Sequence, residues 1–256
     1  MPLKGYYDGS GKSDDKNCRL LTLAGYCGEG SEWDAFRHAW IEILKKHNAP
    51  EEHGDPYMHM VDATSLNKGF SKTHGWTKPK VGQLVLDLFR VLRDFGFDRL
   101  RGVCCPVALS DWRRAASQFK HPFPDSAESL CVELCIRNTV IINPNDAGKP
   151  KIVQLYFDRG EDFMKKIYRT WTNAPESKRQ GWQRQTESIG TVTRLCPGVQ
   201  AADVIAWITN KHFTDGTDAE YEMWYQLLVP ALVRKPKQPY GYDDILPFMK
   251  ENSPED

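Results

Sequence analysis

The sequence predicts an α/β fold built on a mixed β-sheet. Two apolar runs open the chain on either side of a turn rich in glycine, serine and aspartate, which is typical of an antiparallel hairpin. Further apolar runs then alternate with segments of helical periodicity. Strands joined through helices usually run parallel. A sheet that contains both kinds of pairing is therefore expected, with helices against it.

The first half of the chain supplies four of the expected strands. Helix boundaries follow from capping residues and from glycine or proline stops. Asp34 follows Ser31 by three residues, as in a capping box. The elements are expected in this order: a strand ending at Asp8, a strand over 19–26, a helix from Ser31 to residue 48, a strand over 57–62, a loop over 63–78, an amphipathic helix from Pro79 to Gly96, and a strand over 100–107.

The second half alternates strands and helices before a proline-rich end. We expect a main domain over residues 1–212 and a helical, Pro-rich extension packed on it over 213–256. The elements are expected in this order: a short helix capped by Ser110, a helix from Asp125 or Ser126 to Arg137, a strand over 152–158, a helix over 161–171, a loop over 173–185, a strand over 188–196, and helices over 199–212 and 218–228.

The composition is that of an ordinary soluble chain. There are 34 Lys and Arg against 34 Asp and Glu, so the formal net charge is +0 and any nucleic-acid binding must come from a local patch. No apolar stretch approaches membrane-spanning length, and the first residues lack the apolar segment of a signal peptide. The 7 cysteines are an odd number that suits a reduced compartment. We expect a cytoplasmic protein without a membrane partner.

Four aspartates stand where secondary structure would aim them at a common point. Asp8, Asp62 and Asp158 end apolar runs, and Asp203 lies in an apolar helical stretch. A carboxylate so placed is costly unless something compensates it, and hard divalent cations do so well. The alternatives are a turn residue for Asp8, an N-cap for Asp158 and a simple strand end for Asp62.

Asp203 is the hardest of the four to explain as a surface residue. Its helical neighbours on both sides are almost all apolar, so its charge must face a partner or a cavity. Gln200 precedes it by three residues and shares its helical face. His59 precedes Asp62 by three residues, and strand alternation would put the two side chains on opposite faces.

Three short motifs resemble the prokaryotic family called domain of unknown function 3800. They are Tyr7-Asp8-Gly9-Ser10-Gly11, the run 156–159, and Gln200-Ala201-Ala202-Asp203. The likeness spans roughly residues 4 to 212 and includes the segment from Met58 to Trp76. It implies a ribonuclease H-like fold, a mixed sheet flanked by helices. The family usually has an acidic residue where Gly9 stands here.

Basic and aromatic residues are interleaved after Asp158. Such a segment suits single-stranded or structured nucleic acid, although a solvated helix face and loop would look the same. The candidate nucleic-acid-binding residues are Lys165, Lys166, Arg169, Trp171, Lys178, Arg179 and Trp182.

These observations favour a Mg²⁺- or Mn²⁺-dependent nuclease. Asp8 would bridge a metal pair, Asp158 and Asp203 would each hold one ion, Asp62 would be a fourth ligand, and Lys12 would contact the substrate phosphate. Their carboxylates should then lie within roughly 4–8 Å of one another. The alternatives are a non-catalytic protein of the same fold that binds nucleic acid or protein, in phage-defence or mobile-element biology, and a metal-dependent phosphohydrolase acting on nucleotides.

Overall fold

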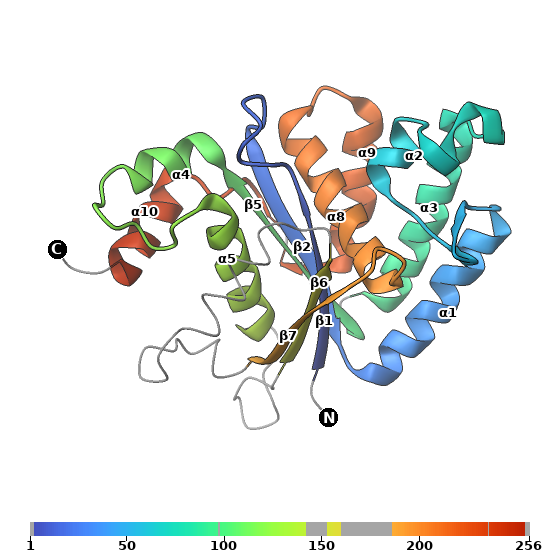
Figure 1. The fold of residues 1–256 in the computed structure, drawn as a ribbon, viewed down its shortest axis with the longest axis horizontal. Coiled ribbons are helices and arrows are strands. Elements are labelled where there is room, and N and C mark those ends of the chain that lie inside the picture. The colour runs from blue at the N-terminus through green and yellow to red at the C-terminus, as the bar shows by residue number, and fades with distance from the viewer. Residues whose placement is uncertain (1–2, 97, 142–152, 160–185, 235, 254–256) are drawn as a thin grey trace.

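The protein is described here by a computed structural model that covers residues 3–96, 98–141, 153–159, 186–234 and 236–253 (Figure 1). Its centre is a 6-stranded sheet in the order β7-β6-β1-β2-β5-β8, and a 2-stranded sheet, β3 (Glu51–Glu52) with β4 (Asp55–Pro56), lies apart from it. The expected helix over 161–171 and loop over 173–185 lie outside the described residues.

The main sheet is mixed, as the sequence predicts. β1 (Leu3–Ser10), β2 (Leu20–Gly28) and β5 (Leu100–Ala108) are successive antiparallel neighbours. β6 (Val153–Asp158) then runs parallel to β1, and β7 (Thr186–Val192) runs parallel to β6. This order and these directions confirm the predicted α/β class, a mixed sheet flanked by helices.

Helices cover both faces of the sheet (Figure 1). One face carries α1 (Gly30–Lys46), α3 (Lys78–Phe95), α8 (Pro197–Thr214) and α9 (Ala219–Leu228), which share a core with Ala24, Tyr26 and Cys104 of the strands. The other face carries α4 (Leu109–Ala116), α5 (Ala127–Ile141) and α10 (Tyr242–Asn252). The sheet therefore separates two apolar cores.

Alternation along β1 assigns its side chains to these two cores. Tyr7 is fully buried on the α5 side, where its hydroxyl lies 2.8 Å from Oγ1 of Thr139. Tyr6 packs on the opposite side, against the core of α1 and α8. Because successive residues of a strand point to opposite faces, Lys4 and Asp8 lie on the same side as Tyr6.

Helix α8 lies directly on β1. A Cβ added at Gly198 would stand 2.6 Å from Cγ of Tyr6, so glycine is required for this close approach. Near the other end of α8, Nδ2 of Asn210 donates to the carbonyl oxygen of Leu20 at 2.9 Å. These contacts fix the middle of α8, including Asp203, beside the end of β1.

The expected strand over 57–62 is wrong. The segment instead enters a short helix, α2 (Met60–Thr64), for which His59 is the N-cap. The N–H groups of Met58 and Met60 donate to the side chains of Gln200 and Asp203, at 3.1 and 2.7 Å. The segment is thus anchored on helix α8 rather than in a sheet, and its alternating apolar residues are buried there.

Three smaller expectations also differ from the structure. Two 3₁₀ helices, η1 (Lys68–Phe70) and η2 (Lys72–His74), occupy the expected loop over 63–78. The predicted capping box at Ser31 is wrong, because α1 begins at Gly30 and no side chain caps it among the described residues. Ser110 does not cap α4 either, since that helix starts one residue earlier.

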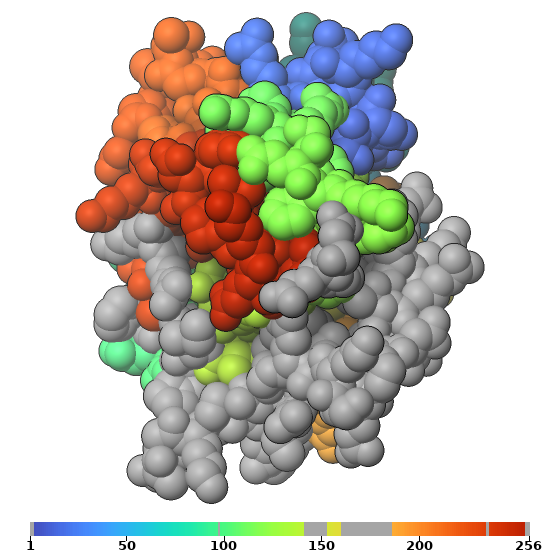
Figure 2. Space-filling model, turned by 90° about the vertical axis from the view of Figure 1, so that its left-hand side faces the viewer, coloured from blue at the N-terminus to red at the C-terminus, as the bar shows by residue number. Residues whose placement is uncertain are grey.

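The C-terminal segment packs on both faces of the sheet. After η4 (Val229–Ala231), strand β8 (Leu232–Arg234), which the sequence did not predict, joins the main sheet parallel to β5. Figure 2 shows α10 in red beside α4 in green, and the guanidinium of Arg114 lies 3.9 Å from the ring centroid of Tyr242. The division between residues 212 and 213 stays a prediction, and α8 runs across it.

Candidate functional site

Asp8 and Asp158 are neighbours on adjacent strands. Tyr7 and Phe157 are paired in the parallel register of β1 and β6, so Asp8 and Asp158 each follow a paired residue directly. Tyr7 and Phe157 are both buried in the α5 core. Asp8 and Asp158 therefore point to the opposite face, toward α8. Asp8 is buried, and its Oδ1 accepts the N–H of Gly9 at 2.8 Å.

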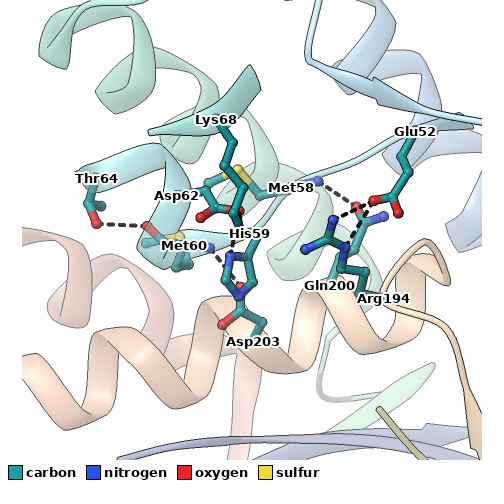
Figure 3. Close-up of polar contacts among 10 residues, drawn as sticks. All are labelled: Glu52, Met58, His59, Met60, Asp62, Thr64, Lys68, Arg194, Gln200 and Asp203. Carbon is teal, nitrogen blue, oxygen red and sulfur yellow. Dashed lines mark hydrogen bonds and ion pairs between the residues drawn. The ribbon is translucent and has the colours of Figure 1, made fainter. Parts of the chain in front are cut away.

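Asp203 lies in the middle of α8 and is only 6% exposed. Its Oδ2 accepts the N–H of Met60 at 2.7 Å (Figure 3). Burial raises the pKa of Asp203 to about 6, and repulsion from Asp158 and Asp62 adds to the rise, whereas attraction to His59 and the Met60 N–H oppose it. Carboxylates from three separate elements therefore interact here.

Asp62 is held by Lys68 and His59. Its Oδ2 lies 3.0 Å from Nζ of Lys68 and 3.1 Å from Nδ1 of His59. The prediction that His59 and Asp62 lie on opposite faces is wrong, because residues three apart on a helix share a face. Figure 3 shows the His59 ring between Asp62 and Asp203. Sequence reasoning missed His59 and Lys68 because it treated the segment as a strand followed by a loop.

Gln200 organises the segment that faces Asp203. Its Oε1 accepts from Nε1 of Trp40 at 2.9 Å and from the N–H of Met58 at 3.1 Å, and its Nε2 donates to the carbonyl oxygen of Leu195 at 3.1 Å. Gln200 and Asp203, predicted to share a helical face, together hold Met58 and Met60 against α8. The spacing Gln-x-x-Asp thus serves local architecture as well as the carboxylate cluster.

The donor chemistry of this cluster fits a hard divalent cation. Asp8, Asp158, Asp203 and Asp62 offer only carboxylate oxygens, which Mg²⁺ and Mn²⁺ prefer. The pKa of Asp203 is raised mainly by its burial, with a smaller contribution from the nearby Asp158 and Asp62. Across the described ranges, however, no group of three or more His, Cys, Asp or Glu side chains is arranged to hold a metal ion. Close convergence of Asp8, Asp158 and Asp203 stays a prediction.

The remaining candidate residues are not part of this cluster. Lys12 is exposed in the turn between β1 and β2. The basic and aromatic candidates from Lys165 to Trp182 lie outside the described residues. No helix in the described part of the chain is both long and apolar enough to cross a membrane.

Known structures with a similar chain path were found, but no known family was matched. Ribonuclease HII of Archaeoglobus fulgidus, solved in complex with PCNA, is 14% identical, with a TM-score of 0.41 over 92% of this chain and 95% of that one. Ribonuclease H2 of Pyrococcus horikoshii OT3 is 12% identical, with a TM-score of 0.37 over 97% and 100%. No family model and no curated protein matches the sequence. The resemblance to domain of unknown function 3800 therefore stays a prediction.

Proposed function

We propose that this protein is a Mg²⁺- or Mn²⁺-dependent nuclease that hydrolyses phosphodiester bonds of nucleic acid. The observation that carries the proposal is the environment of Asp203. This buried carboxyl faces Asp158 and Asp62, and its pKa is raised to about 6. A protein that needed only a folded core would be more stable with an apolar residue at this position, since burying a charged carboxylate is costly.

Asp8, Asp158 and Asp203 would hold the metal ions, with Asp62 as a further ligand. A bound metal pair supplies an activated water and stabilises the leaving oxygen of the phosphodiester. The chain itself orients the carboxylates. The Met60 N–H fixes Oδ2 of Asp203, and the Gly9 N–H fixes Oδ1 of Asp8. Groups that orient ligands in this way affect both metal affinity and activity.

Lys68 and His59 have a separate task in this proposal. They share Oδ2 of Asp62, which keeps that carboxylate in place on α2 and lowers the negative charge around it. Lys12, exposed in the β1–β2 turn, is available to a substrate phosphate. The candidate residues from Lys165 to Trp182 would bind further phosphates of the nucleic-acid substrate.

Cleavage assays test the proposal directly. The wild type is incubated with single-stranded, duplex, hybrid and branched substrates in Mg²⁺ and in Mn²⁺. We expect Mn²⁺-favoured cleavage that Asp8→Asn and Asp158→Asn each reduce by at least about a hundredfold, the range seen when essential catalytic groups are removed. Asp94→Asn, at an exposed position on α3, is the matched control. Equal residual activity in all three variants would point to a contaminating nuclease.

A second candidate is a non-catalytic protein that binds nucleic acid or a protein partner. It is favoured by the protein contacts that the carboxylates already make: Asp62 pairs with Lys68 and His59, and Asp203 accepts the Met60 N–H. These contacts could be purely structural. Metal binding separates the two candidates, because only the nuclease requires it.

A further inference from the structure

A second polar feature lies on the same side of the sheet, toward the start of β1. It is a pocket of about 580 Å³ bounded by α1, β1, the end of β7 and the start of α8. Lys4 and Tyr6 line it, and they occupy the same face of β1 as Asp8. Arg159, which follows Asp158, also lines it. The pocket thus adjoins the carboxylate cluster along β1 and at the end of β6. Its volume is that of a small-molecule site.

Three cationic side chains line this pocket. They are Lys4, Arg37 and Arg159, and none makes an ion pair in the part of the chain that the structure describes. Two other arginines are paired: Nε of Arg99 lies 2.5 Å from Oε2 of Glu32, and Nη2 of Arg194 lies 2.5 Å from Oε2 of Glu52. The pocket cations therefore remain available to an anion, and guanidinium groups can bind phosphate oxygens in pairs.

The start of α8 adds to the positive potential of the pocket. Cys196 precedes the helix, and Pro197 and Gly198 of its first turn line the pocket. Burial raises the pKa of the Cys196 thiol, but the N–H groups of Gly198 and Val199 and the charge of Arg37 favour its ionised form. Arg37 and the helix N-terminus therefore act on the same point, where an anion would be stabilised.

The pocket also offers acceptors for a ligand that carries hydrogen-bond donors. Asp34 and Asp55 line it, as do the hydroxyl groups of Thr191 and Thr193. A simple anion would be repelled by the two carboxylates and would leave most of the volume empty. A ligand with a phosphate at one end and hydroxyl or amino groups at the other satisfies both sets of side chains.

We infer that this pocket binds a nucleotide unit, with its phosphate between Arg37, Arg159 and the start of α8, and with its sugar or base donors toward Asp34 and Asp55. The nucleotide could be free or part of a strand. We expect the nucleotide to belong to a nucleic-acid strand, because the pocket adjoins the carboxylates that would cleave such a strand. This expectation rests on the proposed function.

Binding is measured in EDTA, so that it does not depend on metal or on cleavage. The probes are adenosine monophosphate, a short fluorescein-labelled oligothymidylate and inorganic phosphate, each titrated against the full chain. Gly30 is the best position for a test substitution, because it lines the pocket and a Cβ added there would meet no atom within 4 Å. Gly30→Glu places a carboxylate among the cations, and a glutamate in the first turn suits a helix. Gly30→Ala is its matched control.

We expect Gly30→Glu to weaken binding of the nucleotide probe by at least about tenfold while Gly30→Ala leaves it unchanged. Arg37→Gln should weaken it by a similar factor, and Arg93→Gln, at an exposed arginine on α3, should not. Binding of both organic probes would identify a nucleotide pocket open to either source, and binding of the oligonucleotide alone would identify a subsite for a strand.

Three results would overturn the inference: no binding of either organic probe, equal affinity in Gly30→Glu and Gly30→Ala, or competition by inorganic phosphate as strong as by adenosine monophosphate. Loss of cleavage in Asp8→Asn with unchanged binding in EDTA would leave the pocket intact. The failure of one proposal is thereby distinguishable from the failure of the other.

Discussion

Two buried aspartates on the same side of the sheet have opposite electrostatic surroundings. Asp87 of α3 is 2% exposed, and Asp203 of α8 is 6% exposed. Asp87 is surrounded by His47, Lys46 and Arg90, whose hydrogen bonds and charges lower its pKa to about 2. Burial raises the pKa of Asp203 to about 6; repulsion from Asp158 and Asp62 adds to the rise, and the attraction of His59 offsets it only in part.

The difference indicates which of the two aspartates would be stabilised by a bound cation. Asp87 already has its counter-charges and joins α1 to α3, with Nζ of Lys46 and Nε2 of His47 each 2.9 Å from its Oδ2. The attraction of His59 does not offset the burial of Asp203, so a bound cation would stabilise the charged form of this carboxyl. We therefore assign Asp87 to stability and Asp203 to the proposed metal site.

The largest expected effect is an opposite pH dependence of the two residues. The folded-state pKa of Asp203 is about 6, against an ordinary value of 3.8. Its stabilising contribution is thus present at low pH and is lost as pH rises from about 4 through about 6, by about 3 kcal/mol. Without metal, Asp203→Asn should gain stability relative to the wild type across this window, as measured by urea unfolding. A pH-independent difference would contradict the assignment.

Asp87 should show the reverse dependence of stability on pH, and its mutation should destabilise the protein. Its pKa is lowered, so its contribution is present above about pH 4 and is lost as pH falls toward about 2. Asp87→Asn should lower the free energy of unfolding at neutral pH by about 2 kcal/mol, because hydrogen bonds from charged donors are lost. Asp94→Asn, on the exposed side of the same helix, is the control. A loss as small as that of the control would show that the cations around Asp87 contribute little.

The smallest expected effect concerns Lys68. Its side chain is 58% exposed, so Lys68→Gln should cost less than about 1 kcal/mol of stability. Removing this charge beside Asp62 should nevertheless raise Mn²⁺ affinity a few-fold, because a competing cation is gone. Titration calorimetry compares this variant with Lys72→Gln, an exposed lysine on η2. Weaker Mn²⁺ binding in Lys68→Gln alone would indicate that Lys68 positions Asp62 rather than competing with metal.

The sequence predicted the sheet and the burial of Asp203, but not the surroundings of Asp62. Apolar runs identify β1, β2, β5 and β6, because burial in a sheet imposes that pattern directly. The segment 57–62 shows the same apolar alternation, yet its backbone donors bond to Gln200 and Asp203. Such long-range side-chain contacts leave no local signal, so α2 and the pairing of His59 with Asp62 could not be foreseen. Asp87 was missed for the same reason, since its partners on α1 are distant in sequence.

The most direct test of the account is the effect of Mn²⁺ on thermal stability in wild type and Asp203→Asn. A ligand that binds only the folded state raises the melting temperature, and saturation at about a hundred times Kd adds about 2.7 kcal/mol. We predict a clear rise in the wild type and in Asp94→Asn, and a much smaller one in Asp203→Asn at the same Mn²⁺ concentration. An equal rise in Asp203→Asn, or no rise in the wild type, would contradict the claim that Asp203 belongs to a metal site.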